Sequence, residues 1–203
     1  MSSTPATKGN LLAAKASRAQ AKNGFDLMDR KRNILIRELM GLIDKAAELQ
    51  KSIGTTFSDA YATMVEANLS TGGCGNIAGA VPIDNSLNLR YRSVMGVELT
   101  SVVSKAETDL TRMPYGFSGT SSALDDAYFK FAEVKELSLR LAETENAIYR
   151  LAWAIKKTQK RANALQNIVI PGLDADIARM NDELEEKERE EFTRLKVIKS
   201  RKV

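Results

Sequence analysis

Apolar residues in the last third of the chain recur at alternating intervals of four and three residues. The series runs from Leu137 to Leu165, and three of its positions carry Thr or Ala. Its members are Leu137, Leu141, Thr144, Ile148, Leu151, Ile155, Thr158, Ala162 and Leu165. This repeat is typical of a coiled-coil helix, which buries a narrow apolar stripe against a partner helix of similar length.

The first third of the chain supplies a second stripe with the same spacing. Near its start the register is interrupted by Arg32. Its members are Phe25, Met28, Leu35, Leu39, Leu42, Ala46, Leu49, Ile53, Phe57, Ala60, Met64 and Ala67. We therefore expect a mainly α fold, a long intramolecular antiparallel coiled coil of N- and C-terminal helices. At about 1.5 Å per residue, helices of about 60 and 75 residues would form a rod roughly 90 to 110 Å long.

The expected first helix spans residues 8 to 68, with Thr7 as its N-cap. Four glycines lie inside this range, and each costs on the order of 1 kcal/mol relative to Ala. We favour one helix that tolerates them over two helices broken at Asn23 and Gly24.

The segment between the helices has a different pattern. Leu87, Leu89 and Tyr91 alternate with polar residues, which predicts a half-exposed strand. We expect this strand to continue through residues 93–99, with Gly96 marking either a bulge or a close backbone contact, as part of a short β-hairpin with exposed edges. A short helix is expected at residues 101–111.

Two further parts of this segment are expected to be loops. The glycine-rich residues 72–75 follow a helix and precede none, which favours a linker around Cys74. Residues 114–119 predict a loop with two exposed aromatic residues, Tyr115 and Phe117.

The C-terminal helix is expected to begin at Ser122, where Asp125 completes a pattern similar to a capping box. Beyond Leu165 the apolar spacing changes to successive fours around Pro171. Proline removes one helical hydrogen bond, so we expect one bent helix rather than two. These boundaries divide the chain into an N-terminal shaft helix (1–68), a central segment (69–121) and a C-terminal shaft helix (122–203).

The charge distribution says more than the net charge of +4. Basic residues gather near both termini, and an antiparallel pair would bring the termini to one end. We therefore expect a basic tip. Its members are Lys8, Lys15, Arg18, Arg194, Lys196, Lys199, Arg201 and Lys202. Residues 182–191 form an acidic run, which we interpret mainly as a solvated helix face.

The composition argues against an enzyme. The chain has no histidine and one cysteine, and it contains no phosphate-binding glycine loop of the usual spacing. We expect no catalytic residues, no cofactor and no metal. Neither a secretory signal nor an apolar stretch of about 20 residues is present, so we expect a cytoplasmic protein without direct membrane insertion.

Several functions share this architecture. A cytoplasmic coiled-coil scaffold would explain the rod, although not the central β element. A nucleic-acid-binding coiled coil would use the basic tip, but the acidic run lies close to that tip. The shaft of an F-type ATP synthase would need a larger central α/β domain than residues 69–121 provide.

Four segments carry a resemblance to a known family. They are TPATKGNLL at residues 4–12, RSVMGVEL at 92–99, NIVIPGL at 167–173 and LEEKEREEFTRLK at 184–196. Together they resemble the D subunit of the V-type (archaeal or vacuolar-type) ATPases and ATP synthases, in order and over nearly the whole chain.

This resemblance implies a central rotor shaft, peripheral to the membrane, that couples ATP hydrolysis or synthesis to ion translocation by rotation. The implied partners are the nucleotide-binding A and B subunits of the catalytic head, the small F subunit of the rotor and an adaptor on the membrane ring, and not nucleic acid. The basic tip would meet the head. The expected lower-end partner contacts are Leu87, Leu89, Arg90, Tyr91, Arg92 and Met95.

Overall fold

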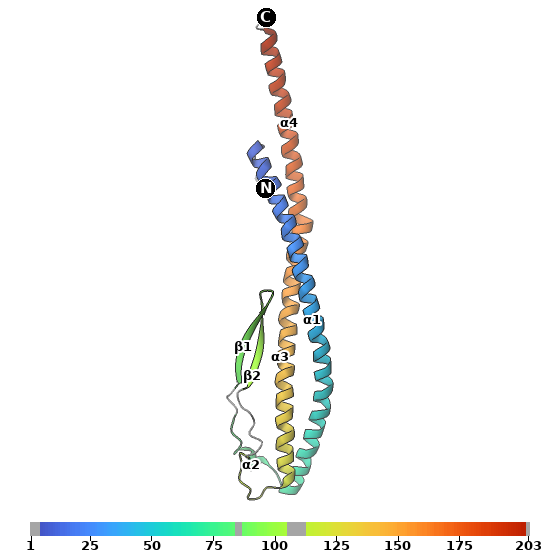
Figure 1. The fold of residues 1–203 in the computed structure, drawn as a ribbon, viewed down its shortest axis with the longest axis vertical. Helices are drawn as coiled ribbons and strands as arrows, with labels where there is room; N and C mark the ends of the chain where they lie inside the picture. Colours follow the sequence, from blue (N-terminus) through green and yellow to red (C-terminus); the bar gives the residue numbers. More distant parts are fainter. Residues whose placement is uncertain (1–4, 84–86, 105–112, 202–203) are drawn as a thin grey trace. The chain divides into compact units, whose positions relative to one another are not determined.

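The computed structural model describes residues 5–83, 87–104 and 113–201. Its elements follow the order α1 (Lys8–Thr71), α2 (Gly75–Ala78), β1 (Leu87–Val94), β2 (Val97–Ser104), α3 (Ser122–Ala164), the π-helical turn η1 (Leu165–Val169) and α4 (Ile170–Arg201). The predicted fold class, long N- and C-terminal helices with a small hairpin between them, is confirmed (Figure 1).

The chain divides into two compact units. We call Met1–Ile34 with Ile155–Val203 the terminal unit, and Leu35–Ala154 the central unit. Helices α1 and α3 each contribute residues to both units.

In the terminal unit, α1 pairs with the C-terminal helical segment in antiparallel fashion. Lys8 contacts Glu188, Arg18 contacts Asp174, and the Arg32 guanidinium donates a hydrogen bond to the Gln159 side chain at 2.7 Å. Helix α1 is continuous through Gly24, whose Cα lies against Leu165, since a Cβ there would be 3.8 Å from that side chain. The single-helix interpretation is therefore confirmed. The Thr7 hydroxyl caps α1 by accepting a hydrogen bond from the Asn10 amide.

The successive steps of four around Pro171 coincide with η1. The Ile170 amide donates to the Leu165 carbonyl, five residues earlier, in place of the usual four. A π-helical turn holds more residues than an α-helical turn, so it accommodates wider apolar spacing. Pro171 follows directly as the second residue of α4. Proline is tolerated in the first turn of an α-helix, and Pro171 lies in the first turn of α4. The helical run therefore continues through the proline.

In the central unit, α1 and α3 form a second antiparallel pair. Gln50 contacts Glu145, and the ring of Tyr61 packs edge-on against Phe131 at 5.7 Å between centroids. Apolar positions from the predicted stripes are buried here, including Leu35, Ala60 and Leu151. The pairing follows the three/four spacing of both stripes.

One end of the central unit has its own small core. Ala67, Cys74, Tyr115, Leu124 and Ala127 are buried against one another. This corrects two predictions. Cys74 is not in a simple linker, because it is buried and directly precedes the short helix α2. Tyr115 is buried, whereas Phe117 is exposed as expected.

The capping pattern at Ser122 and Asp125 also has a different role. Helix α3 begins at Ser122 as predicted. The Asp125 carboxylate, however, accepts a 2.7 Å hydrogen bond from the Tyr115 hydroxyl. It therefore helps to hold the preceding loop against the core.

The hairpin is confirmed, but its turn differs from the prediction. β1 and β2 pair antiparallel, with Val94 opposite Val97, so Met95 and Gly96 form the turn. Both have positive φ, 51° and 76°, as in a type I′ turn. Gly96 is therefore a turn residue rather than a bulge, and residues 93–99 are not one strand. Residues 101–104 belong to β2, which corrects that part of the expected short helix; residues 105–111 lie outside the described part of the chain.

Candidate functional site

Three of the predicted basic residues form ion pairs inside the terminal unit: Lys8 and Arg18 pair across its two helices, and Arg194 lies 3.6 Å from Glu190 of its own helix. The Lys8 ammonium lies 2.9 Å from the Glu188 carboxylate, and Arg18 pairs with Asp174. The hydrogen bond and charge of Glu188 raise the pKa of Lys8 above its ordinary value of 10.5. Because both members of the Lys8 pair are largely exposed, this contact adds little stability. Lys8, Arg18 and Arg194 thus already have acidic partners on α4.

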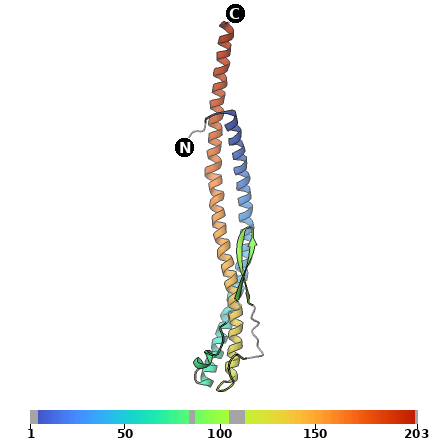
Figure 2. The same ribbon diagram turned by 90° about the vertical axis from the view of Figure 1, so that its left-hand side faces the viewer.

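Helix α4 continues past the start of α1. Lys8 meets Glu188, and the carbonyl of Ala6 accepts a hydrogen bond from Lys187, so residues 189–201 extend beyond the paired region (Figure 2). We call residues 189–201 the α4 end. The predicted cations Arg194, Lys196, Lys199 and Arg201 lie on it and are exposed. Lys202 lies outside the described residues, and Lys15 is exposed on α1.

The α4 end also carries apolar side chains that the sequence analysis missed. Phe192, Leu195 and Ile198 are spaced by three and are all more than half exposed. This spacing places them on neighbouring parts of the helix surface. This apolar spacing is present in the sequence, but the acidic and basic residues around these positions make the charge pattern the more prominent feature. The α4 end is therefore a mixed surface of cations and apolar residues.

All six predicted lower-end contacts lie on β1 or in its turn. Leu89 and Tyr91 are 58% and 63% exposed, and no position of β1 is fully buried. The prediction of a half-exposed strand is thus wrong for β1, because the hairpin packs on the helices mainly through β2, where Leu99 and Thr100 are buried. The Arg92 guanidinium lies 3.9 Å from Glu38 of α1.

Met95 has an unusual conformation for its residue type. Its φ of 51° lies in the left-handed region, which costs roughly 1 to 2 kcal/mol for a residue with a Cβ. Asn or Gly is the usual choice at this turn position. The Met95 side chain is nevertheless 45% exposed, so packing in the described structure does not account for the choice of Met.

The segments that surround the small core of the central unit form a surface without charged residues. Residues 67–83 and 113–124 contain no Asp, Glu, Lys or Arg, although 28% of the chain is charged. The Ser70 and Ser121 hydroxyls, 2.7 Å apart, join the two segments. We call these two segments the uncharged end. Leu69, Ile83 and Phe117 protrude from it, each more than three-quarters exposed. The sequence contained this signal as two runs lacking charge.

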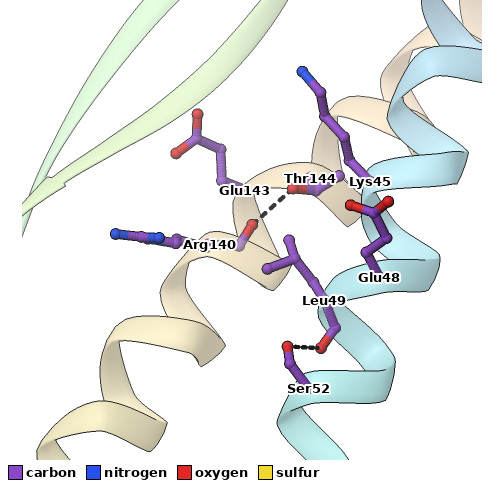
Figure 3. Close-up of a pocket in the computed structure, with 7 residues that line it drawn as sticks. All are labelled: Lys45, Glu48, Leu49, Ser52, Arg140, Glu143 and Thr144. Carbon is purple, nitrogen blue, oxygen red and sulfur yellow. Dashed lines mark hydrogen bonds between the residues drawn. The ribbon is translucent and has the colours of Figure 1, made fainter.

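A shallow groove lies between α1 and α3 in the central unit. It has a volume of about 560 Å³. Figure 3 shows Leu49 directed into it and the Glu143 carboxylate directed toward the hairpin. The lining residues are Lys45, Glu48, Leu49, Ser52, Arg140, Glu143 and Thr144. Its charged groups lie on open helix faces, an arrangement better suited to polar protein contacts than to holding a small substrate.

The described residues form neither a metal-binding cluster nor a membrane-spanning helix. No group of His, Cys, Asp and Glu side chains in residues 5–83, 87–104 and 113–201 is placed to hold a metal ion. Over the same residues, none of the helices has both the length and the apolar character required to cross a membrane.

Comparison with known proteins agrees with the resemblance in the four sequence segments. The family model for the ATP synthase D subunit matches residues 10–200. The V-type ATP synthase D subunit of Thermotoga neapolitana is 43% identical over 198 residues, which cover 96% of each chain. The A-type ATP synthase D subunits of Pyrococcus horikoshii and Thermococcus gammatolerans are 33% and 34% identical over 197 residues, covering 96% of this chain and 92% of each relative. This chain belongs to the ATP synthase D-subunit family.

Proposed function

We propose that this chain is the non-catalytic central-stalk rotor subunit of a V-type or A-type ATP synthase. It would couple ATP hydrolysis or synthesis in the catalytic head to ion translocation by rotating. The observation that carries the proposal is the family match over residues 10–200. The scaffold and nucleic-acid hypotheses offer no explanation for that match, and ion pairs already engage part of the predicted basic surface.

The helix pairs support a role in transmitting torque. In this proposal residues 1–68 and 122–203 form the shaft, and residues 69–121 form its lower segment. Contacts such as Arg18–Asp174 and Arg32–Gln159 join the two helices of the terminal unit. When two helices are joined side by side, twisting one displaces the other, so the pair resists torsion better than a single helix.

We assign the α4 end to the catalytic head, formed by the nucleotide-binding A and B subunits. Its cations stand on long, solvated side chains, and its apolar residues lack a partner helix within the described part of the terminal unit. Contacts between exposed charges are individually weak. Such contacts let a surface pass several partners in turn, whereas deep complementary packing would hold one orientation. Lys8, Lys15 and Arg18 are proposed to contribute at the edge of this surface.

We assign the other two surfaces to the remaining rotor partners. The exposed residues Leu87, Leu89, Arg90, Tyr91, Arg92 and Met95 would bind the small F subunit of the rotor. The uncharged end would rest on the adaptor of the membrane ring, because removing an uncharged surface from water avoids the large cost of desolvating ions. The chain would thus be peripheral, on the cytoplasmic side, and would need no cofactor of its own.

The proposal can be tested by co-purification. The tagged full-length chain would be recovered from solubilised host membranes, and its partners would be identified by mass spectrometry. We expect the large nucleotide-binding subunits and the small rotor subunit. A variant that ends at residue 188 should retain the small rotor subunit but lose most of the head. Recovery of nucleic acid or unrelated proteins by the full-length chain would contradict the proposal.

A further inference from the structure

The two outer edges of the hairpin differ. Val94 and Val97 flank a two-residue turn and therefore exchange both backbone hydrogen bonds, and hydrogen-bonded pairs alternate along the ladder from there. The backbone groups of residues 98, 100 and 102 then point outward from β2. Those of residues 87, 89, 91 and 93 point outward from β1.

Helix α3 covers the β2 edge. The Arg150 guanidinium donates a 3.0 Å hydrogen bond to the Glu98 carbonyl, and the Val102 amide donates a 3.2 Å hydrogen bond to the Glu143 carboxylate. Both helix residues therefore bind backbone groups that a neighbouring strand would otherwise bind. Figure 1 shows the hairpin beside α3. This edge is closed to a further strand.

The β1 edge is open. In the part of the chain that the structure describes, no hydrogen bond reaches the outward groups of Leu87, Leu89, Tyr91 and Ser93. The same alternation places the side chains of Leu87, Leu89 and Tyr91 on one face, and all three are exposed. The opposite face carries Arg92, near Glu38, and the buried Leu99. On β2, the buried residues Leu99 and Thr100 lie on opposite faces, opposite Arg92 and Tyr91, so burial of the hairpin follows the β2 strand and the apolar side chains of β1 remain exposed.

We propose that an extended segment of the small rotor subunit adds to the hairpin as a third strand, paired with the outer edge of β1. This inference rests on the proposed function and specifies how the two subunits bind. Strand addition satisfies the outward backbone groups of the edge, and side chains on the two faces supply specificity. The open edge favours it over a contact made by side chains alone.

The side chains of β1 define the chemistry of the added segment. One face of that segment should carry apolar residues opposite Leu87, Leu89 and Tyr91. The other face should carry a carboxylate near Arg90, because opposite charges on neighbouring strands attract. Arg90 is exposed in the structure, while Arg92 already lies near Glu38. If a second copy of this chain paired with the β1 edge, the arginines at positions 90 and 92 of the two copies would lie close together. Repulsion between these like charges disfavours edge-to-edge pairing of two hairpins.

Proline at position 89 separates backbone pairing from side-chain contact. The Leu89 amide points outward, so Leu89→Pro removes a donor from the open edge and leaves the β1–β2 ladder intact. Leu89→Ala loses the same side chain but retains the amide, and it is the matched control. In titrations of the full-length chain with the purified small rotor subunit, we expect Leu89→Pro to bind about tenfold more weakly than Leu89→Ala.

Residue-resolved amide hydrogen exchange provides the second readout. In the free wild-type chain the outward amides of Leu89, Tyr91 and Ser93 should exchange faster than the ladder amides of Arg90 and Arg92. Adding the small rotor subunit should slow the outward amides. The ladder amides of Leu89→Pro should remain slow, which would show that its hairpin is folded.

Equal affinities for Leu89→Pro and Leu89→Ala, or unchanged exchange of the outward amides in the complex, would overturn strand addition. So would a free wild-type chain that dimerises through this edge, detected as a sedimentation shift abolished by Leu89→Pro. If strand addition is overturned in one of these ways but the wild-type chain still assembles with the head and the small rotor subunit, the proposed function stands. If it recovers neither, the proposed function fails as well.

Discussion

The α4 end and the uncharged end differ in charge and in burial: the first is an exposed, charged helix, and the second is an uncharged surface over a buried core. The α4 end is a single helical surface rich in Lys and Arg, with exposed Phe192, Leu195 and Ile198. The uncharged end closes over a core that includes Cys74 and Tyr115. Charged side chains retain their water and make weak, exchangeable contacts, whereas an uncharged surface can be buried at little electrostatic cost. The first chemistry suits a moving contact and the second a fixed one.

The largest effect is expected from removing the core of the uncharged end. Tyr115→Ala should lower the free energy of unfolding of the central unit by about 3 to 5 kcal/mol, because a large buried ring is lost. Tyr115→Phe should cost only about 1 kcal/mol, since it loses the hydrogen bond to Asp125 but fills the same space. Urea unfolding followed by circular dichroism measures both. Equal losses would mean that the ring does not hold this end together.

The same pair of variants gives a pH signature. Burial, with a further contribution from the Asp125 hydrogen bond, raises the pKa of Tyr115 above its ordinary value of 10.0. The folded state therefore binds this proton more tightly than the unfolded state. Its contribution to stability is complete below about pH 10 and falls as the pH rises toward the folded-state pKa. Wild type should lose stability faster than Tyr115→Phe above that pH.

Reversing the charges of the α4 end should break the proposed moving contact. The triple variant Lys196→Glu, Lys199→Glu, Arg201→Glu should lower ATP hydrolysis coupled to rotation about tenfold or more, because a surface complementary to cations repels carboxylates. The loss should lessen at high salt, which screens exposed charges. Lys156→Glu, on an exposed position of α3, is the single-charge control. Unchanged coupling in the triple variant would remove the α4 end from the contact with the head.

A charge placed on the uncharged end should break the proposed fixed contact. Phe117→Lys should weaken association with the membrane-ring adaptor about tenfold to a hundredfold, since the interface would bury an unpaired charge. The free energy of unfolding should change by less than about 0.5 kcal/mol, because Phe117 is exposed. Tyr149→Lys, at a similarly exposed aromatic residue on α3, is the control. Equal binding by both variants would place the adaptor elsewhere.

The smallest effect is expected at the ion pair beside the α4 end. Lys8→Gln should leave the melting temperature at pH 7 almost unchanged, because both side chains of the Lys8–Glu188 pair are exposed. The raised pKa of Lys8 means that its contribution is complete below about pH 10.5 and is lost as the pH rises further. Melting curves of both proteins between pH 7 and 11 test this. A large difference at neutral pH would show that the pair is structural.

The errors of sequence interpretation lie at a turn and where distant segments meet. Met95 has apolar neighbours and lacks a turn signal such as Asn-Gly, so the local pattern favours a continuous strand through it. The neighbours of Tyr115 predict a loop, and the same local reasoning predicts an exposed ring. Its burial depends on Ala67 and Leu124, which local pattern alone does not place beside it.

Local sequence was sufficient for the long helices, the cap at Thr7, the existence of a hairpin and the family. Helical spacing and characteristic segments such as residues 184–196 can be read from neighbouring positions. Long-range packing was needed to establish that α3 closes the β2 edge and leaves β1 open. That outcome depends on Glu143 and Arg150, which meet Val102 and Glu98 across 41 and 52 residues of chain. Side-chain contacts at such separations arise only when the helices have paired.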